Sequence, residues 1–132
     1  MDPAALSDPQ GPAGRGLLLS RDLMFISKVT GTAAVLGLRV DVVATIEQLP
    51  LEVRANPPRA VFLDLNCTEF APDAVIESLE VVPRPHVIAF GSHVDTARLA
   101  SAQRAGCDEV LPRSQFSASL PELLRKNLGT SE

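Results

Sequence analysis

The 132-residue sequence contains no Trp, no Tyr and only five Phe. Its 45% hydrophobic content must therefore come mainly from Leu, Val, Ile and Ala. These side chains fill parallel sheets that are covered by helices, so the composition favours an α/β protein. At this length the chain is sufficient for one domain with a single core and too short for two comfortable ones.

Long apolar runs and clusters of basic residues are also missing. The longest apolar stretches, such as residues 60–63 and 86–90, fall far below the roughly 20 residues that a membrane span needs. No signal-peptide pattern is found at the N-terminus, so we expect a cytoplasmic protein without membrane contact. The net charge is −4, and the 12 basic residues are scattered, which argues against nucleic acid as a partner.

The sequence has two cysteines and two histidines, and neither pair has the spacing of a zinc site. Cys67 and Cys107 are forty positions apart, and His86 and His93 complete no ligand set. We interpret both cysteines as ordinary thiols and assign no metal to them.

Three segments divide the chain. Residues 1–14 hold three Pro and two Gly without periodicity and are expected to be a flexible tail. Residues 15–129 form the predicted domain, and residues 130–132 a short C-terminal tail. No DNA-binding segment follows the last predicted helix, so we expect either a stand-alone domain or one excised from a longer protein.

Apolar runs and helical periodicity alternate along the domain. Strands are predicted at residues 16–20, 39–44, 59–65, 86–90 and 108–111. Helices are predicted at residues 21–38, 45–58, 72–82, 95–106 and 117–128. Five strands that alternate with five helices predict a doubly wound parallel sheet with helices on both faces.

Turn and cap residues mark several helix ends. Gly37 is available to end the first helix, and Asp95 and Gly106 to begin and end the fourth. Ser20 is expected to cap the first helix. Pro50 should kink the second helix or delay its start.

Two more end signals concern the other helices. Pro72 stands in the first turn of the third predicted helix, where proline is tolerated. Ser117 or Ser119 is the expected cap of the last helix.

In such sheets the functional site lies beyond the carboxyl ends of the strands. The candidate site residues on this edge are Ser20, Arg21, Asp22, Asp64, Asn66, Gly91, Ser92 and Arg113.

Two segments resemble the receiver domain of bacterial two-component response regulators, the CheY-like family. "VFLDLN" is similar to the strand that carries the family's phosphoacceptor aspartate, here Asp64, followed two residues later by a metal-binding carbonyl, here that of Asn66. "LASAQRAGCDEVLPRSQF" is similar to the family's Ala-rich helix, short strand and basic residue before Phe. The resemblance covers about residues 16–128 and implies a flavodoxin-like sheet with strand order 2-1-3-4-5.

The same resemblance implies a magnesium site that this chain departs from. In the family, an acidic pair at the end of the first strand holds Mg²⁺ together with the phosphoacceptor, and hard oxygen ligands are what Mg²⁺ requires. Here the pair aligns with Ser20 and Arg21, a hydroxyl and a cation. A one-residue slip would restore one acid, Asp22, with Arg21 still beside it. Only under a phosphorylation reading are Asp22, Asp64 and Asn66 weak candidates for Mg²⁺.

Three further family positions also differ. The switch hydroxyl at the end of strand four aligns with Gly91, with Ser92 one residue late, and the switch aromatic aligns with Val110. The lysine after strand five aligns with Arg113, whose planar, bidentate guanidinium does not substitute conservatively for an ammonium. The proline after it is Ser114 here. Of the five features, only Asp64 is retained.

We therefore expect a non-catalytic pseudo-receiver that acts through protein–protein interaction without a cofactor. Asp64 is expected to form an internal ion pair with Arg21 or Arg113, which favours its ionised form. One alternative is a phospho-accepting receiver with Asp64 as phosphoacceptor and Mg²⁺ as cofactor. A less favoured one is a small-molecule-binding flavodoxin-like domain, although a flavin would need a phosphate loop and aromatic walls.

The fourth helix and its flanks provide the predicted partner face. Arg98, Ser101 and Gln103 are expected to point outward, with Val110 nearby, whereas Leu99 and Ala102 should face the sheet. The partner would be another signalling protein, namely a kinase, an output protein or a second copy of the chain in a homodimer. A plain solvated helix face is the competing interpretation.

Overall fold

The computed structural model of the chain describes residues 14–80 and 83–129. The predicted C-terminal tail and all but Gly14 of the predicted N-terminal tail lie outside the described residues. Gly14 donates its backbone N–H to the carbonyl of Leu128, at 3.1 Å.

Five parallel strands form one sheet. They are β1 (Arg15–Leu19), β2 (Arg39–Val43), β3 (Ala60–Asp64), β4 (His86–Gly91) and β5 (Glu109–Pro112), in the order β2-β1-β3-β4-β5. All four neighbouring pairs are parallel. The predicted fold class and strand order are therefore confirmed, and all five carboxyl ends meet at one edge of the sheet.

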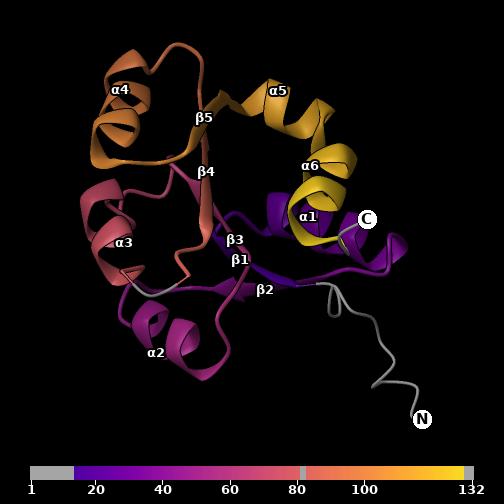
Figure 1. The fold of residues 1–132 in the computed structure, drawn as a ribbon. Coiled ribbons are helices and arrows are strands. Elements are labelled where there is room, and N and C mark those ends of the chain that lie inside the picture. The colour runs from indigo at the N-terminus through magenta and orange to yellow at the C-terminus, as the bar shows by residue number, and fades with distance from the viewer. Residues whose placement is uncertain (1–13, 81–82, 130–132) are drawn as a thin grey trace, which may run out of the picture.

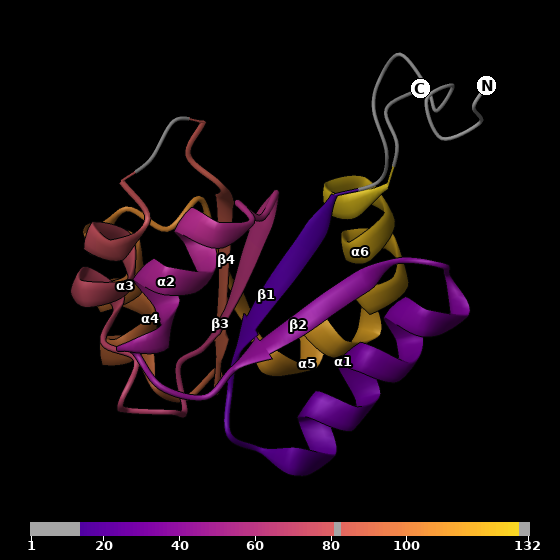
Figure 2. The same cartoon turned by 90° about the horizontal axis from the view of Figure 1, so that it is seen from below.

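Helices cover both faces of this sheet (Figures 1 and 2). On one face lie α2 (Gln48–Ala55), α3 (Pro72–Ser78) and α4 (Thr96–Ala105). On the other lie α1 (Leu23–Val35), α5 (Arg113–Ala118) and α6 (Leu120–Leu128). No helix in the described part of the chain is long and apolar enough to cross a membrane.

The central strands supply a core on each side of the sheet because side chains alternate between the two faces along a strand. Leu17 and Leu19 of β1 pack toward α2, α3 and α4, whereas Leu18 packs toward α1, α5 and α6. The second side holds four of the Phe rings, with Phe90 and Phe116 stacked at 4.2 Å between centroids. Both layers are buried, as the near-continuous apolar strands predicted.

The start of α1 differs from the prediction. Asp22, not Ser20, is the N-cap residue, and its carboxylate accepts hydrogen bonds from the N–H groups of Met24 and Phe25. Ser20 stands one residue beyond β1, and its hydroxyl is directed to the edge of the sheet instead. The predicted end is confirmed, because Gly37 follows α1 with a positive φ of 72°.

Two helices are shorter than predicted. α2 begins at Gln48, so Pro50 falls within its first turn, where no backbone N–H is needed for the helix. α3 ends at Ser78, and Val81 and Val82, which the prediction included, lie outside the described residues.

The last part of the chain contains a helix that the sequence analysis missed. α5 begins at Arg113 directly after β5, and Phe116 anchors it in the core. α6 then starts after Ser119, whose hydroxyl makes no capping hydrogen bond. By contrast, α4 is capped by Asp95 and ended by Gly106 as expected.

Candidate functional site

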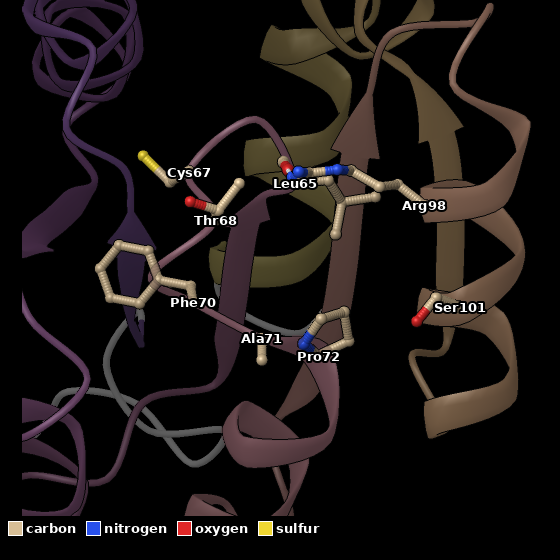
Figure 3. A pocket seen from close by; sticks show the side chains of 8 residues that line it. All are labelled: Leu65, Cys67, Thr68, Phe70, Ala71, Pro72, Arg98 and Ser101. Atoms are coloured by element: carbon tan, nitrogen blue, oxygen red, sulfur yellow. Dashed lines mark hydrogen bonds between the residues drawn. The ribbon is translucent and has the colours of Figure 1, made fainter.

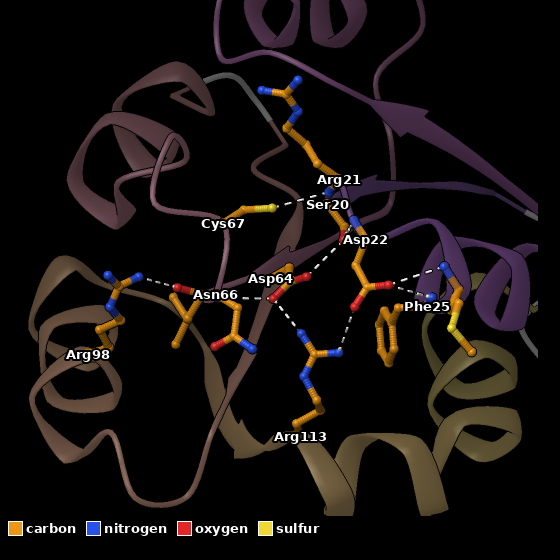
Figure 4. Close-up of polar contacts among 11 residues, drawn as sticks. Ser20, Arg21, Asp22, Phe25, Asp64, Asn66, Cys67, Arg98 and Arg113 are labelled. Carbon is orange, nitrogen blue, oxygen red and sulfur yellow. Dashed lines mark hydrogen bonds and ion pairs between the residues drawn. The ribbon is translucent and has the colours of Figure 1, made fainter.

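Asp64 is the last residue of β3 and lies at the centre of the carboxyl edge of the sheet (Figure 4). Only 1% of its surface is exposed. Burying a carboxylate this deeply is costly unless it is paired and hydrogen-bonded. Its partners therefore determine what the residue can do.

Both carboxylate oxygens of Asp64 are occupied. Oδ1 accepts from Nη2 of Arg113 at 2.8 Å and from the backbone N–H of Asn66 at 3.0 Å. Oδ2 accepts from the Ser20 hydroxyl at 2.8 Å. The backbone N–H of Asp22 in turn donates to the same hydroxyl at 3.2 Å. A charged donor and two neutral donors thus compensate the buried charge.

Arg113 is fixed from several sides. Its guanidinium carbon lies 4.6 Å from the ring centroid of Phe25 and 5.5 Å from that of Phe90, within range of a cation–π interaction. Nη1 lies 3.9 Å from Oδ2 of Asp22. Nε is buried and has no hydrogen-bond partner among the described residues. The planar guanidinium uses its two terminal nitrogens toward two carboxylates while its face rests on aromatic rings.

Arg21, the other arginine considered for this pairing, does not contact Asp64. Its guanidinium pairs with Glu69, and its backbone N–H donates to the sulfur of Cys67 at 3.1 Å. Burial is the largest influence on the pKa of the Cys67 thiol and raises it. The open choice between the two arginines is thus resolved in favour of Arg113.

The residues present do not fit a magnesium ion. Asp22 uses Oδ1 to cap α1, Asp64 has both oxygens occupied, and the Arg113 cation stands between them. Among residues 14–80 and 83–129, no group of three or more His, Cys, Asp and Glu side chains could hold a metal ion. The chemistry of this donor set favours an internal ion pair over a divalent cation.

The position of the switch hydroxyl is closed by packing. Gly91 is buried at the end of β4, and a β-carbon there would stand 3.1 Å from Cβ of Leu65. Ser92 is half-buried in the following turn, and its hydroxyl accepts the Val94 N–H at 3.4 Å. Ser92, Asn66 and Arg113 line one shallow polar hollow. A hydroxyl that reaches Asp64 from strand four is therefore absent from the described structure.

The predicted partner face is only partly as expected. Leu99 and Ala102 pack against the core, as predicted. Gln103 is exposed, and Ser101 is half-buried. Arg98 is half-exposed, with 40% of its side chain accessible, but its guanidinium also donates to the backbone carbonyl of Leu65 and pairs with Asp95 at 3.2 Å.

Sequence reasoning missed the role of Arg98, because nothing in the local pattern shows that a residue on the surface of α4 reaches the end of β3, three elements earlier. Val110, the remaining residue of this face, is half-buried on β5 and packs against the core on the side of α4.

No family model matches the sequence, and no characterised protein matches it in sequence. Solved structures do match its fold. The response-regulator receiver domain from Bermanella marisrubri is 20% identical, with a TM-score of 0.73 over 86% of this chain and 96% of that one. The chain has the receiver fold.

Two further solved structures share this receiver fold. The receiver domain of the sensor histidine kinase PA1611 from Pseudomonas aeruginosa, which has a magnesium ion in its active-site cleft, is 18% identical with a TM-score of 0.73, covering 89% of this chain and 99% of that one. NtrX from Brucella abortus, in complex with ADP, is 18% identical with a TM-score of 0.72. That match covers 88% of this chain and 26% of the longer one, so the receiver fold there is one part of a larger protein.

Proposed function

We propose that this chain is a pseudo-receiver, a signalling module that regulates a partner protein without phosphorylation of Asp64. It would perform no chemical step of its own and would bind no metal or cofactor. The receiver fold, which occurs in two-component signalling proteins, supports the general role.

The observation that carries the proposal is the arrangement around Asp64. Phosphoryl transfer depends on cations that neutralise the incoming phosphoryl group, held in place before the reaction. Here the Arg113 cation is already bound to Oδ1 of Asp64, so its charge is used within the protein. The Ser20 hydroxyl occupies the second oxygen, and in the part of the chain that the structure describes no acidic pair stands beside it to recruit a metal.

Incubation with acetyl phosphate and Mg²⁺ tests this directly. We expect no adduct of about 80 Da in the intact mass and no Mg²⁺-dependent spectral change with a beryllium fluoride mixture. The matched variant carries S20D, R21D and R113K together, which restores the receiver family's charges around an unchanged Asp64. An adduct on the variant but not on the natural chain would support the proposal.

A stoichiometric adduct on Asp64 of the natural chain, abolished by D64N, would overturn the proposal. It would establish the second candidate function, a phospho-accepting receiver. One contact favours keeping that candidate: Asp22 is half-exposed and stands only 3.9 Å from Arg113, so one further carboxylate is within reach of the site.

The partner would be another signalling protein, or a second copy of the chain. We place its contact on the surface of α4 and β5, where Gln103 is exposed and Ser101 and Val110 are half-buried. Arg98 contributes to this surface only through the part of its side chain that its bonds to Leu65 and Asp95 leave accessible.

A further inference from the structure

A separate apolar pocket lies between the loop after β3 and α4 (Figure 3). It has a volume of about 170 Å³. Its lining residues are Leu65, Cys67, Thr68, Phe70, Ala71, Pro72, Arg98 and Ser101. None of their side chains makes a hydrogen bond or ion pair with Asp64 in the described structure. The polar partners of the Asp64 carboxylate are Ser20, Asn66 and Arg113, so the pocket is distinct from the carboxylate site.

The floor and walls of the pocket are apolar and rigidly placed. Leu65 and Phe70 are 3% and 1% exposed, and both belong to the core on this side of the sheet. Ala71 and Pro72 form the wall at the start of α3, where the proline ring fixes the backbone. A ligand would meet a preformed surface and would not have to order it first.

The polar groups at the rim carry no free charge. The Arg98 guanidinium lies against the Leu65 carbonyl and pairs with Asp95, so its charge is already balanced. The hydroxyls of Thr68 and Ser101 have no hydrogen-bond partner within residues 14–80 and 83–129. They can each donate or accept one hydrogen bond.

We propose that this pocket binds a small neutral aromatic molecule of the size of phenol or indole. The size follows from the volume, because an apolar cavity of about 150 Å³ holds a benzene ring. Neutrality follows from the balanced charge of Arg98, because its pairing with Asp95 leaves no unpaired cation in the pocket lining to compensate an acid. The polar group of the ligand would bond to the Thr68 or Ser101 hydroxyl.

A ligand in the pocket would affect the carboxylate site through its contact with Leu65. This residue follows Asp64 directly, its backbone N–H donates to the Phe90 carbonyl at 2.9 Å, and its side chain closes the space above Gly91. A ring that packs on Leu65 therefore touches a side chain that lines the pocket and also packs against the end of β4. Binding itself does not depend on whether Asp64 accepts a phosphoryl group.

The absence of Trp and Tyr makes the test direct, because indole and phenol fluoresce without background from the protein. Titration of the full chain into indole should give a saturable blue shift with a Kd of about 0.1–1 mM. Phenol should compete, and benzoate should bind at least about tenfold more weakly because it brings an uncompensated carboxylate. Amide shifts in nitrogen-15 spectra should concentrate on Leu65, Phe70 and Ser101.

S101F fills the pocket and should abolish the blue shift. Q103F, an exposed position two residues further along the same helix, introduces the same side chain outside the pocket and should leave binding unchanged. The proposal is overturned if indole shows no saturable binding up to 10 mM, a limit about tenfold above the expected range. It is also overturned if both variants bind equally, or if the amide shifts of the natural chain fall elsewhere. The amide-shift measurement uses only the natural chain, so it tests the proposal even if S101F does not fold.

Discussion

Arg113 reaches back 49 positions along the chain to place Nη2 2.8 Å from Oδ1 of Asp64. The two residues stand at the ends of β5 and β3, with β4 between them. Only a long side chain crosses this gap, and it does so over the rings of Phe90 and Phe25. The pair is a tertiary contact that ties the last strand of the sheet to its centre.

Replacing Asp64 should destabilise the fold and should not remove a reaction. D64N leaves the Arg113 cation without its buried partner, and we expect a loss of about 2 to 3 kcal/mol in the free energy of unfolding. This is below the value for a fully buried pair because 25% of the Arg113 side chain is exposed. Urea unfolding measures it, with E77Q on the exposed face of α3 as control. An equal effect of the two substitutions would contradict the assignment.

Exchanging the cation for a smaller one should also cost stability. R113K keeps the charge but loses the planar contact with Phe25 and Phe90, so we expect a loss of about 1 kcal/mol. R21K changes an exposed pair with Glu69 and should alter the free energy of unfolding by less than about 0.5 kcal/mol. Thermal unfolding of both variants compares them. A larger effect at Arg21 would show that the two arginines have been assigned to the wrong roles.

Restoring a hydroxyl at the end of β4 should strain the core. In G91T the new β-carbon would stand 3.1 Å from Leu65, and overpacking of this kind costs about 1 to 3 kcal/mol. L65A removes Cδ1, which would lie 3.3 Å from the new β-carbon, but it keeps Cβ at 3.1 Å, so it relieves only part of the crowding. A double-mutant cycle should therefore show that the cost of G91T is smaller, but not abolished, in the L65A background. Strict additivity of the two changes would mean that Leu65 does not close this position.

Acid should weaken a second ion-pair cluster, which Asp41 of β2 forms with Arg15 and Arg39. Burial would raise the pKa of Asp41, but hydrogen bonds from Arg15 and Arg39 outweigh it and hold that pKa below its ordinary value of 3.8. The folded state therefore favours the ionised form. The stabilisation that the ionised Asp41 gives the folded state is complete above the ordinary pKa of 3.8. It is lost as the pH falls through the lower pKa that Asp41 has in the folded state.

The comparison of natural chain and D41N at several pH values checks this. The difference in free energy of unfolding should be constant near neutral pH and should shrink below about pH 4. D73N, at an exposed carboxylate without an ion pair in the described structure, should show no such change. A difference that grows on acidification would have the wrong sign for this mechanism.

Local patterns were sufficient for most elements because the alternation of apolar runs and the caps at Asp95, Gly37 and Gly106 are encoded within a few residues. Local patterns did not predict α5, which follows β5 without a loop. α5 begins at the residue after β5, so its six residues lacked the polar turn that would have marked a new helix. The buried ring of Phe116 was the one available signal, since it anchors this helix.

The site residues illustrate the same limit. The sequence could place Asp64 and both arginines at one edge of the sheet, but it could not choose between the arginines. That choice depends on Glu69, which draws Arg21 away across the loop after β3. The prediction that Ser20 caps α1 was wrong for a similar reason: the buried carboxylate of Asp64, distant in sequence, accepts the Ser20 hydroxyl, and Asp22 caps the helix.

The contact between Asp64 and Arg113 also has a consequence for time. A phosphoryl group is a covalent mark that outlasts the encounter that made it, so a phosphorylated domain keeps a record of a past signal. An ion pair between two side chains is not covalent, so it leaves no chemical mark once it has opened and keeps no such record. A domain set by this pair would follow the present concentration of its partner, and its memory would have to be held by another molecule.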